Sequence, residues 1–186
     1  MKNTDYDEKL IDKDIIINEL KSELEKLKLE NKKLKEELYL DSLTNINNRR
    51  ILDDVTDFDS IIMGDIDYFK NINDLYGHLK GDEVLIEVSN VLSKYIRDTD
   101  IVCRWGGEEF VILLKNCDDK EAYNKALYLK EKISELKEMF GFDITMSFGI
   151  SNFLFKKTMK TAIDEADKAL YKSKKMGRNK VTMYKE

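Results

Sequence analysis

Two apolar runs that flank a pair of glycines constrain the fold of this chain more than any other feature. Residues 101–103 and 110–114 have the composition of β-strands, and Gly106-Gly107-Glu108-Glu109 stands between them. Glycine accepts the positive φ angles of tight turns, so the pattern predicts an antiparallel hairpin with two carboxylates at its tip. The missing Cβ atoms also let a bulky ligand approach the backbone closely. Taken alone, such a motif is more often a surface hairpin with solvated glutamates.

A second acidic cluster follows another predicted strand, over residues 61–66. Asp65 and Asp67 stand at the carboxyl end of this strand, where α/β proteins usually bind ligands. If the strand lies beside the hairpin, Asp65 and Glu108 converge. Two carboxylates that meet at a partly buried site need a cation, and their hard oxygen ligands suit Mg²⁺ or Mn²⁺. Asp67 could instead cap the helix that is predicted to follow.

The N-terminal residues, 1–40, predict one long helix ahead of a second region, 41–186. Residues 8–40 contain no Gly or Pro. The heptad positions a and d are mostly apolar: Leu10, Ile17, Leu24, Asn31 and Leu38 at a, and Leu20, Leu27 and Leu34 at d. Leu at d with one Asn at a favours a parallel two-stranded coiled coil in fixed register. The alternative is a single amphipathic helix packed on its own domain.

Charged residues that flank the apolar seam agree with a parallel pair of helices. Glutamates at g precede lysines at e of the partner helix: Glu23, Glu30, Lys28 and Lys35. Such a coiled coil raises the local concentration of a second copy of the following domain. About 40 residues are too few for a sensor domain. We therefore expect a protein that is constitutive or regulated by assembly, or a fragment of a longer chain.

Length and composition exclude several classes of protein. A chain of 186 residues suits one globular domain with an appendage. It has no run of about 18 apolar residues and no signal-peptide core, so we expect a cytoplasmic protein. Cys103 and Cys117 fit no disulfide framework, and Cys103 is expected to be a small buried hydrophobe.

The charge of the chain is uneven. A net charge of −5 does not indicate nucleic-acid binding. Residues 156–186, however, carry ten Lys and Arg against four Asp and Glu. A basic segment beside an acidic metal site suits a triphosphate, and the alternative is a solvated face of a terminal helix.

The rest of the pattern alternates helices and strands. Helices are predicted over residues 43–55, 68–76, 120–139 and 161–175, with a further helix opened by Asp82. Strands are predicted over residues 61–66, 144–151 and 180–184, together with the hairpin at 101–114. This order predicts an α/β domain of palm or ferredoxin-like type with a mixed sheet.

Five blocks in a fixed order resemble the GGDEF family of diguanylate cyclases, over roughly residues 41–186. The blocks are Asp41-Ser42-Leu43-Thr44 through Arg50, Asp65-Ile66-Asp67 through Asp82, Gly106-Gly107-Glu108-Glu109-Phe110, Ser147-Phe148-Gly149-Ile150, and Ala166-Asp167 through Asn179. The resemblance implies a nucleotidyl cyclase domain that condenses two GTP into cyclic di-GMP and releases pyrophosphate. It also implies a homodimer in which each protomer holds one GTP.

The resemblance further implies roles for individual residues, with two Mg²⁺ or Mn²⁺ ions in each site. The metal ligands would be Asp65, the Ile66 carbonyl, Glu108 and Glu109, with Glu108 also a candidate proton acceptor. Phosphate-binding positions would be Lys70, Lys174 and Arg178, and Lys70 would belong with Glu108 to the catalytic residues. Guanine would be read by Asn73 and Asp82, and the remaining substrate contacts would be Phe69, Gly106 and Gly107.

Several of these residues have simpler explanations. Asp82 could cap a helix. Lys174 and Arg178 lie four residues apart, on one face if the helix persists, and could merely complement a helix C-terminus. His78 is interpreted as structural.

Arg97 and Asp100 match the family's inhibitory RxxD motif, placed just before the glycine pair. Arg97 could bind a product phosphate or guanine edge, and Asp100 the Watson–Crick edge of guanine. We therefore expect feedback inhibition by the product.

The match departs from the family at two places. Asn45-Ile46 stands where Gly-Leu is more common, and residues 152–160 are shorter than usual, without the common Pro. Two other functions stay open at this point: a catalytically silent receptor for GTP or cyclic di-GMP, and a dimerising adaptor that acts through its coiled coil.

Overall fold

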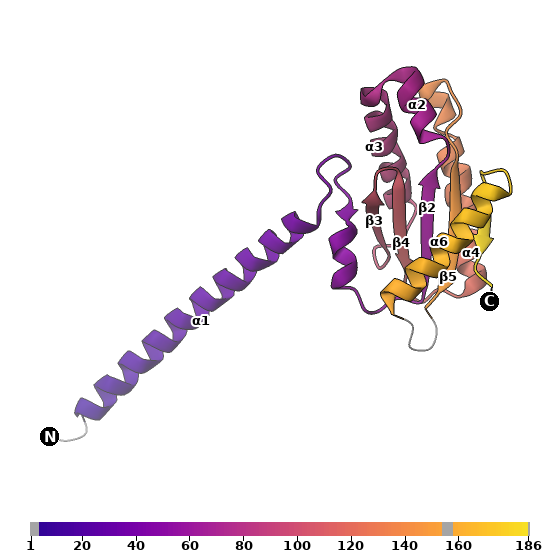
Figure 1. Cartoon of the computed structure of the whole chain (residues 1–186). Coiled ribbons are helices and arrows are strands. Elements are labelled where there is room, and N and C mark those ends of the chain that lie inside the picture. The colour runs from indigo at the N-terminus through magenta and orange to yellow at the C-terminus, as the bar shows by residue number, and fades with distance from the viewer. Residues whose placement is uncertain (1–3, 154–157, 186) are drawn as a thin grey trace. The chain divides into compact units, whose positions relative to one another are not determined.

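A six-stranded mixed sheet organises the larger part of the chain, in the order β1-β3-β4-β2-β5-β6 (Figure 1). The computed structural model describes residues 4–153 and 158–185. Within it the chain divides into two units, Met1–Tyr39 and Leu40–Glu186. The strands are β1 (Asn47–Asn48), β2 (Ser60–Ile66), β3 (Ile101–Gly106), β4 (Glu109–Leu114), β5 (Met146–Asn152) and β6 (Val181–Met183). The predicted strand at 61–66, the hairpin and the mixed sheet are confirmed.

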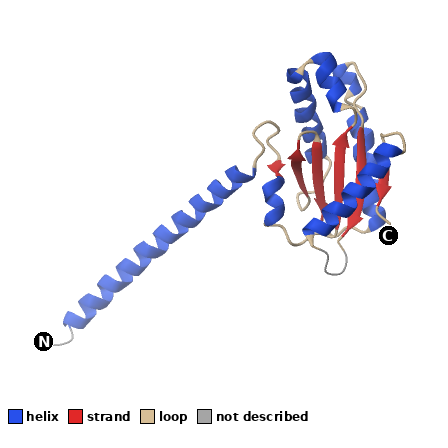
Figure 2. Cartoon of the chain, in the orientation of Figure 1, coloured by secondary structure: helices blue, strands red, loops and turns tan. Residues whose placement is uncertain are grey.

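Helices cover both faces of the sheet (Figure 2). They are η1 (a 3-10 helix, Arg49–Asp53), α2 (Phe69–Tyr76), α3 (His78–Lys94), α4 (Asp119–Ser134), α5 (Lys137–Phe140) and α6 (Met159–Lys175). Side chains alternate along a strand, so neighbouring β2 residues face opposite layers. Ile62 packs in the cluster formed with α3 and α4, whereas Ile61 packs in the cluster formed with η1 and α6.

Strand β2 lies at the centre of the sheet and is paired on both sides. It runs antiparallel to β4 and to β5, and all seven of its residues are buried. A strand buried on both faces favours a continuous apolar run, as Ile61-Ile62-Met63 provides. The two acidic residues at its carboxyl end therefore have a fixed position.

The region predicted as a helix over residues 43–55 folds differently, and that prediction is wrong. Short polar side chains bond the local backbone and compete with the helix. Asp41 Oδ1 accepts the Thr44 N–H at 2.9 Å, and Asn45 adopts a left-handed φ of 58°. The segment then forms β1, which pairs in parallel with β3, before the single turn of η1.

The first unit is one helix, α1 (Thr4–Tyr39). Apolar side chains at its a and d positions are about half exposed in the single chain, and in its described part they are Ile17, Leu20, Leu24, Leu27, Leu34 and Leu38. Lys28 pairs with Glu25 of the same helix at 2.9 Å. The coiled coil itself stays a prediction. No helix within the described ranges has both the length and the apolar character needed to cross a bilayer.

Candidate active site

Three carboxylates meet where β2 ends beside the β3–β4 turn. The Cα atoms of Asp65 and Glu109 are register partners across β2 and β4. The Ile66 N–H donates to the Glu108 carbonyl at 3.2 Å. The structure thus brings the pair Asp65-Ile66 together with the pair Glu108-Glu109, although the two pairs are more than 40 positions apart in the sequence.

The turn that carries the two glutamates is held from one side by Arg104. Gly107 has a φ of +54°, a conformation that side chains with a Cβ seldom adopt. Arg104 Nε donates to the Gly107 carbonyl at 2.9 Å, and its Nη1 donates to Asp41 Oδ1 at 3.1 Å. Asp41 therefore connects the start of the second unit to the glycine turn.

One cation, Lys174, reaches the acidic cluster from the last helix, and a second, Arg178, lies on the loop after it against Tyr68. Lys174, in the last turn of α6, donates to Asp65 Oδ2 at 2.7 Å. Arg178 lies beyond the end of α6 at Lys175 and has a left-handed φ of 61°. The helix ends at Lys175, as predicted, and Gly177 ends the helical path with a φ of 107°. The condition for a shared helix face of Lys174 and Arg178 is therefore not met.

Burial and mutual repulsion disfavour several ionised carboxylates close together in this cluster. Burial raises the pKa of Asp65, the Lys174 ammonium opposes this rise, and Glu108 and Asp67 add to it. The pKa of Glu109 is also raised, first by burial and then by the charge of Asp65. A cation bound beside these groups would favour their ionised forms.

The donor atoms at this site fit a hard divalent cation that is completed by a bound ligand. Among the described residues, no group of three or more His, Cys, Asp or Glu side chains could hold a metal ion alone. Mg²⁺ is commonly bound through one or two carboxylates plus substrate phosphates and water, rather than by a closed protein cage. Asp65 and Glu108 can supply these carboxylates, and the Ile66 carbonyl is a third oxygen at the same strand end.

The predicted guanine-reading pair lies on the helix pair α2–α3. A Cβ built on Gly81 would lie only 1.9 Å from Asn73 Oδ1, so the Asn73 side chain packs directly against α3. Asp82, the next residue, is half-buried. Asp82 is not a helix cap as the sequence suggested, because α3 begins at His78 after Gly77.

Lys70 and Phe69, two further predicted substrate contacts, differ in their exposure to solvent. Lys70 is exposed. The Phe69 side chain is only 7% exposed and packs in the core, so it is not available to a ligand. As the first residue of α2, Phe69 can offer only its backbone N–H, which the helix itself does not use.

Asp100 has a structural role that the RxxD pattern did not predict. Its carboxylate accepts the backbone N–H of Arg97 at 3.0 Å and that of Lys115 at 3.2 Å. Asp100 thus fixes the turn before β3, while the Arg97 side chain is exposed.

The roles of Asp67 and Tyr68 were not predicted from the sequence. Asp67 is buried and does not cap α2, whose N-cap position is Tyr68 with no side-chain cap bond. The Asp67 carboxylate instead accepts hydrogen bonds from Thr145, Ser147 and Asn179. The only local signal was a carboxylate immediately after a buried strand.

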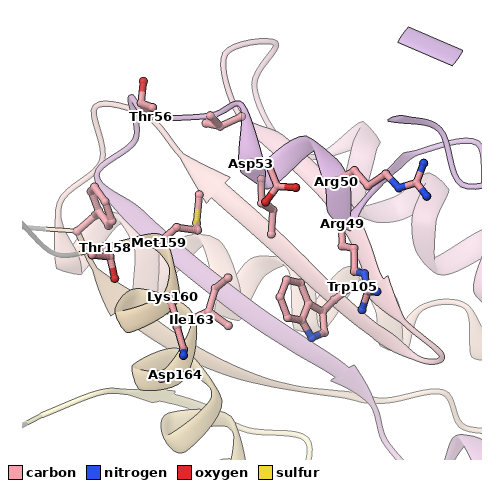
Figure 3. A pocket seen from close by; sticks show the side chains of 13 residues that line it. Arg49, Arg50, Asp53, Thr56, Trp105, Thr158, Met159, Lys160, Ile163 and Asp164 are labelled. Carbon is pink, nitrogen blue, oxygen red and sulfur yellow. The ribbon is translucent and has the colours of Figure 1, made fainter. Parts of the chain in front are cut away.

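A hollow of about 900 Å³ lies between η1 and α6 (Figure 3). Its wall combines Trp105 of β3 with Arg49 of η1 and Met159 and Ile163 of α6. None of the residues predicted to bind substrate or metal lines it.

Comparisons with known proteins agree with these motifs. A family model described as "Diguanylate cyclase, GGDEF domain" matches residues 38–180. Diguanylate cyclase A of Treponema denticola is 42% identical over 130 residues, which cover 68% of this chain and 35% of the relative. The chain spans between about a quarter and just over a third of the length of curated relatives such as this one.

Two solved structures share the fold. The coiled coil and GGDEF domain of DgcB from Caulobacter crescentus, in complex with c-di-GMP, superpose with a TM-score of 0.77 at 26% identity, covering 91% of this chain and 98% of that one. Diguanylate cyclase SiaD of Pseudomonas aeruginosa, in complex with its activator SiaC, gives a TM-score of 0.84 at 27% identity, covering 97% of this chain and 75% of that one. From the family model and the shared fold, we conclude that this chain belongs to the GGDEF domain family of diguanylate cyclases.

Proposed function

We propose that the protein condenses two molecules of GTP into cyclic di-GMP and two pyrophosphates. In each step the 3′-hydroxyl of one GTP attacks the α-phosphate of the other, a phosphorus–oxygen bond forms, and pyrophosphate leaves. The observation that carries this proposal is the Asp65–Lys174 ion pair beside Glu108 and Glu109, because it places acidic and basic groups at one strand end. Such a site suits a divalent cation and a triphosphate together.

The acidic residues would hold the divalent cations, Mg²⁺ or Mn²⁺, with two in each site. Asp65, the Ile66 carbonyl, Glu108 and Glu109 would be the ligands, and their oxygen atoms match the preference of these ions. Bound cations would polarise the α-phosphate and lower the pKa of the attacking hydroxyl. Glu108 would accept the proton of that hydroxyl.

The remaining residues would bind and orient GTP. Lys70, Lys174 and Arg178 would contact the triphosphate. Asn73 and Asp82 would read guanine, since a carboxylate accepts from guanine N1–H and N2–H, a donor pair that adenine lacks. Exposed Gly106 and Gly107, and the backbone N–H of Phe69, would allow a close approach of the nucleotide.

Two copies of the chain would have to meet, because each would hold one of the two GTP molecules. We propose a homodimer through a parallel coiled coil of residues 1–40, followed by the cyclase domain at 41–186. Exposed Leu20, Leu24 and Leu27 on α1 support this pairing. The reaction would take place in the cytoplasm, where GTP is available.

Product feedback would act through Arg97 and Asp100. The exposed Arg97 could bind a product phosphate or a guanine edge. Asp100 would contribute mainly by fixing the backbone of Arg97.

The direct test is to incubate the purified chain with GTP and Mg²⁺ and to resolve the nucleotides by chromatography and mass. We expect cyclic di-GMP and pyrophosphate, both abolished by Glu108→Ala and by Asp65→Ala. GTP binding without product would instead favour a silent receptor. An adaptor that acts through α1 would be indifferent to both substitutions.

A further inference from the structure

Two backbone segments with left-handed residues face each other beside the acidic cluster. Tyr68 has a φ of 56°, and on the loop after α6 Arg178 has 61° and Asn179 has 48°. Non-glycine residues adopt this conformation rarely, and it persists where the surrounding structure enforces it.

Asp67 is the group that ties these segments together. Its side chain is buried at 4% exposure. Oδ2 accepts the Asn179 N–H at 2.9 Å and the Thr145 hydroxyl at 2.8 Å, and Oδ1 accepts the Ser147 hydroxyl at 2.7 Å. One carboxylate therefore fixes the end of β2, the start of β5 and the loop after α6. Tyr68 and Arg178 are the immediate chain neighbours of the two bonded residues Asp67 and Asn179.

The side chains of Tyr68 and Arg178 contact each other directly. The guanidinium carbon of Arg178 lies 4.4 Å from the centroid of the Tyr68 ring, and Nη1 donates to the Tyr68 hydroxyl at 3.3 Å. The Tyr68 ring is 57% exposed, so burial in the core does not explain its position. The Tyr68 ring instead packs against the guanidinium, and this contact limits the rotamers of the long and flexible Arg178 side chain.

We propose that Tyr68 is a positioning residue that holds the Arg178 guanidinium ready for the triphosphate of GTP, with Asp67 fixing the two backbones. The inference rests on the proposed binding of GTP at this site. An arginine that is ordered before the ligand arrives loses less side-chain entropy on binding. Tyr68 acts only through Arg178, so its contribution should vanish when Arg178 is absent.

A double-mutant cycle on the full chain tests this inference, with two equilibrium affinities as readouts: that for GTP, measured with the unreactive 3′-deoxy analogue, and that for guanosine. We expect Tyr68→Leu to weaken GTP binding by roughly two- to five-fold, the range of an exposed cation–π contact, and to leave guanosine binding unchanged. Tyr68→Phe keeps the ring and should stay within about twofold of wild type. In an Arg178→Ala background, Tyr68→Leu should have no further effect.

The matched control is Tyr128→Leu, on α4. The Tyr128 ring also lies under a cation, because Lys132 Nζ is 5.6 Å from its centroid. This control should leave both affinities unchanged. The inference is overturned if Tyr68→Leu does not weaken GTP binding, weakens guanosine binding equally, or has the same effect with and without Arg178. Product formation by the wild-type chain separates this result from the proposed function: if GTP binds without reacting, the cyclase proposal fails and the cycle still decides the role of Tyr68.

Discussion

Removal of the Asp41 carboxylate should destabilise the second unit far more than removal of an exposed carboxylate. Asp41 Oδ1 accepts the Thr44 hydroxyl at 2.8 Å, the Thr44 N–H at 2.9 Å and Arg104 Nη1 at 3.1 Å. The paired side chains are only 16% exposed for Arg104 and 21% for Asp41, so solvent screens the bond incompletely. Hydrogen bonds to charged groups contribute about 1.5–3 kcal/mol.

We therefore expect Asp41→Ala to lower the free energy of unfolding by about 2–3 kcal/mol. Asp41→Asn keeps an acceptor oxygen but loses the charge, and should cost about 1 kcal/mol. The measurement is urea unfolding at a fixed protomer concentration, because a dimer makes stability depend on concentration. The control is Asp57→Ala: its side chain is 77% exposed and pairs with Lys115, and its loss should cost less than about 1 kcal/mol.

Asp41 should also make the stability of the protein depend on pH, with a sign that follows from its pKa shift. Partial burial raises the pKa of Asp41, but the hydrogen bonds from Thr44 and Arg104 outweigh burial, and the net pKa is lowered. A carboxyl whose pKa is lowered by folding stabilises the protein above its unfolded value near pH 4, and this contribution disappears as the pH falls further. The difference in unfolding free energy between wild type and Asp41→Ala should therefore become smaller below about pH 4. An Asp41→Ala protein as stable as wild type at pH 7 would refute the reasoning.

Further outcomes can be measured with related variants and with the wild-type chain. Gly81→Ala should raise the KM for GTP roughly tenfold, because the new Cβ displaces Asn73. Arg97→Ala should weaken inhibition by added cyclic di-GMP at least about tenfold with stability unchanged, whereas Asp100→Ala should also cost about 1–3 kcal/mol in unfolding. Leu27→Lys should give a monomer in sedimentation and little product, since the proposed reaction requires two GTP sites to meet. Chelation of divalent cations by EDTA should stop product formation and leave guanosine binding intact.

The sequence predicted those features that depend on neighbouring residues. The hairpin follows from two apolar runs around a Gly-Gly pair, and β2 follows from Ile61-Ile62-Met63. Asp65 and Glu108 converge because β2 pairs with β4, as expected if the strand at 61–66 lies beside the hairpin.

Features that depend on distant residues could not be predicted in this way. The donors to Asp67 lie 78, 80 and 112 positions away, so a local pattern offered only a helix cap. The bond from Arg104 to Asp41 spans 63 positions. Residues 43–55 do not form the expected helix, because part of this segment forms β1 and pairs with β3. Such tertiary contacts override a modest helix propensity.

The central position of β2 has a consequence for how activity would be lost on warming. Its backbone is bonded on both sides, so amide hydrogens near Asp65 should exchange with solvent only when the whole unit opens. Lys174 lies in the last turn of α6, and Arg178 lies in the loop between α6 and the short edge strand β6. Helix ends and edge strands open at lower free energy than central strands. The basic half of the site should therefore loosen while the acidic half is still intact, and GTP affinity should decline at temperatures below the melting transition.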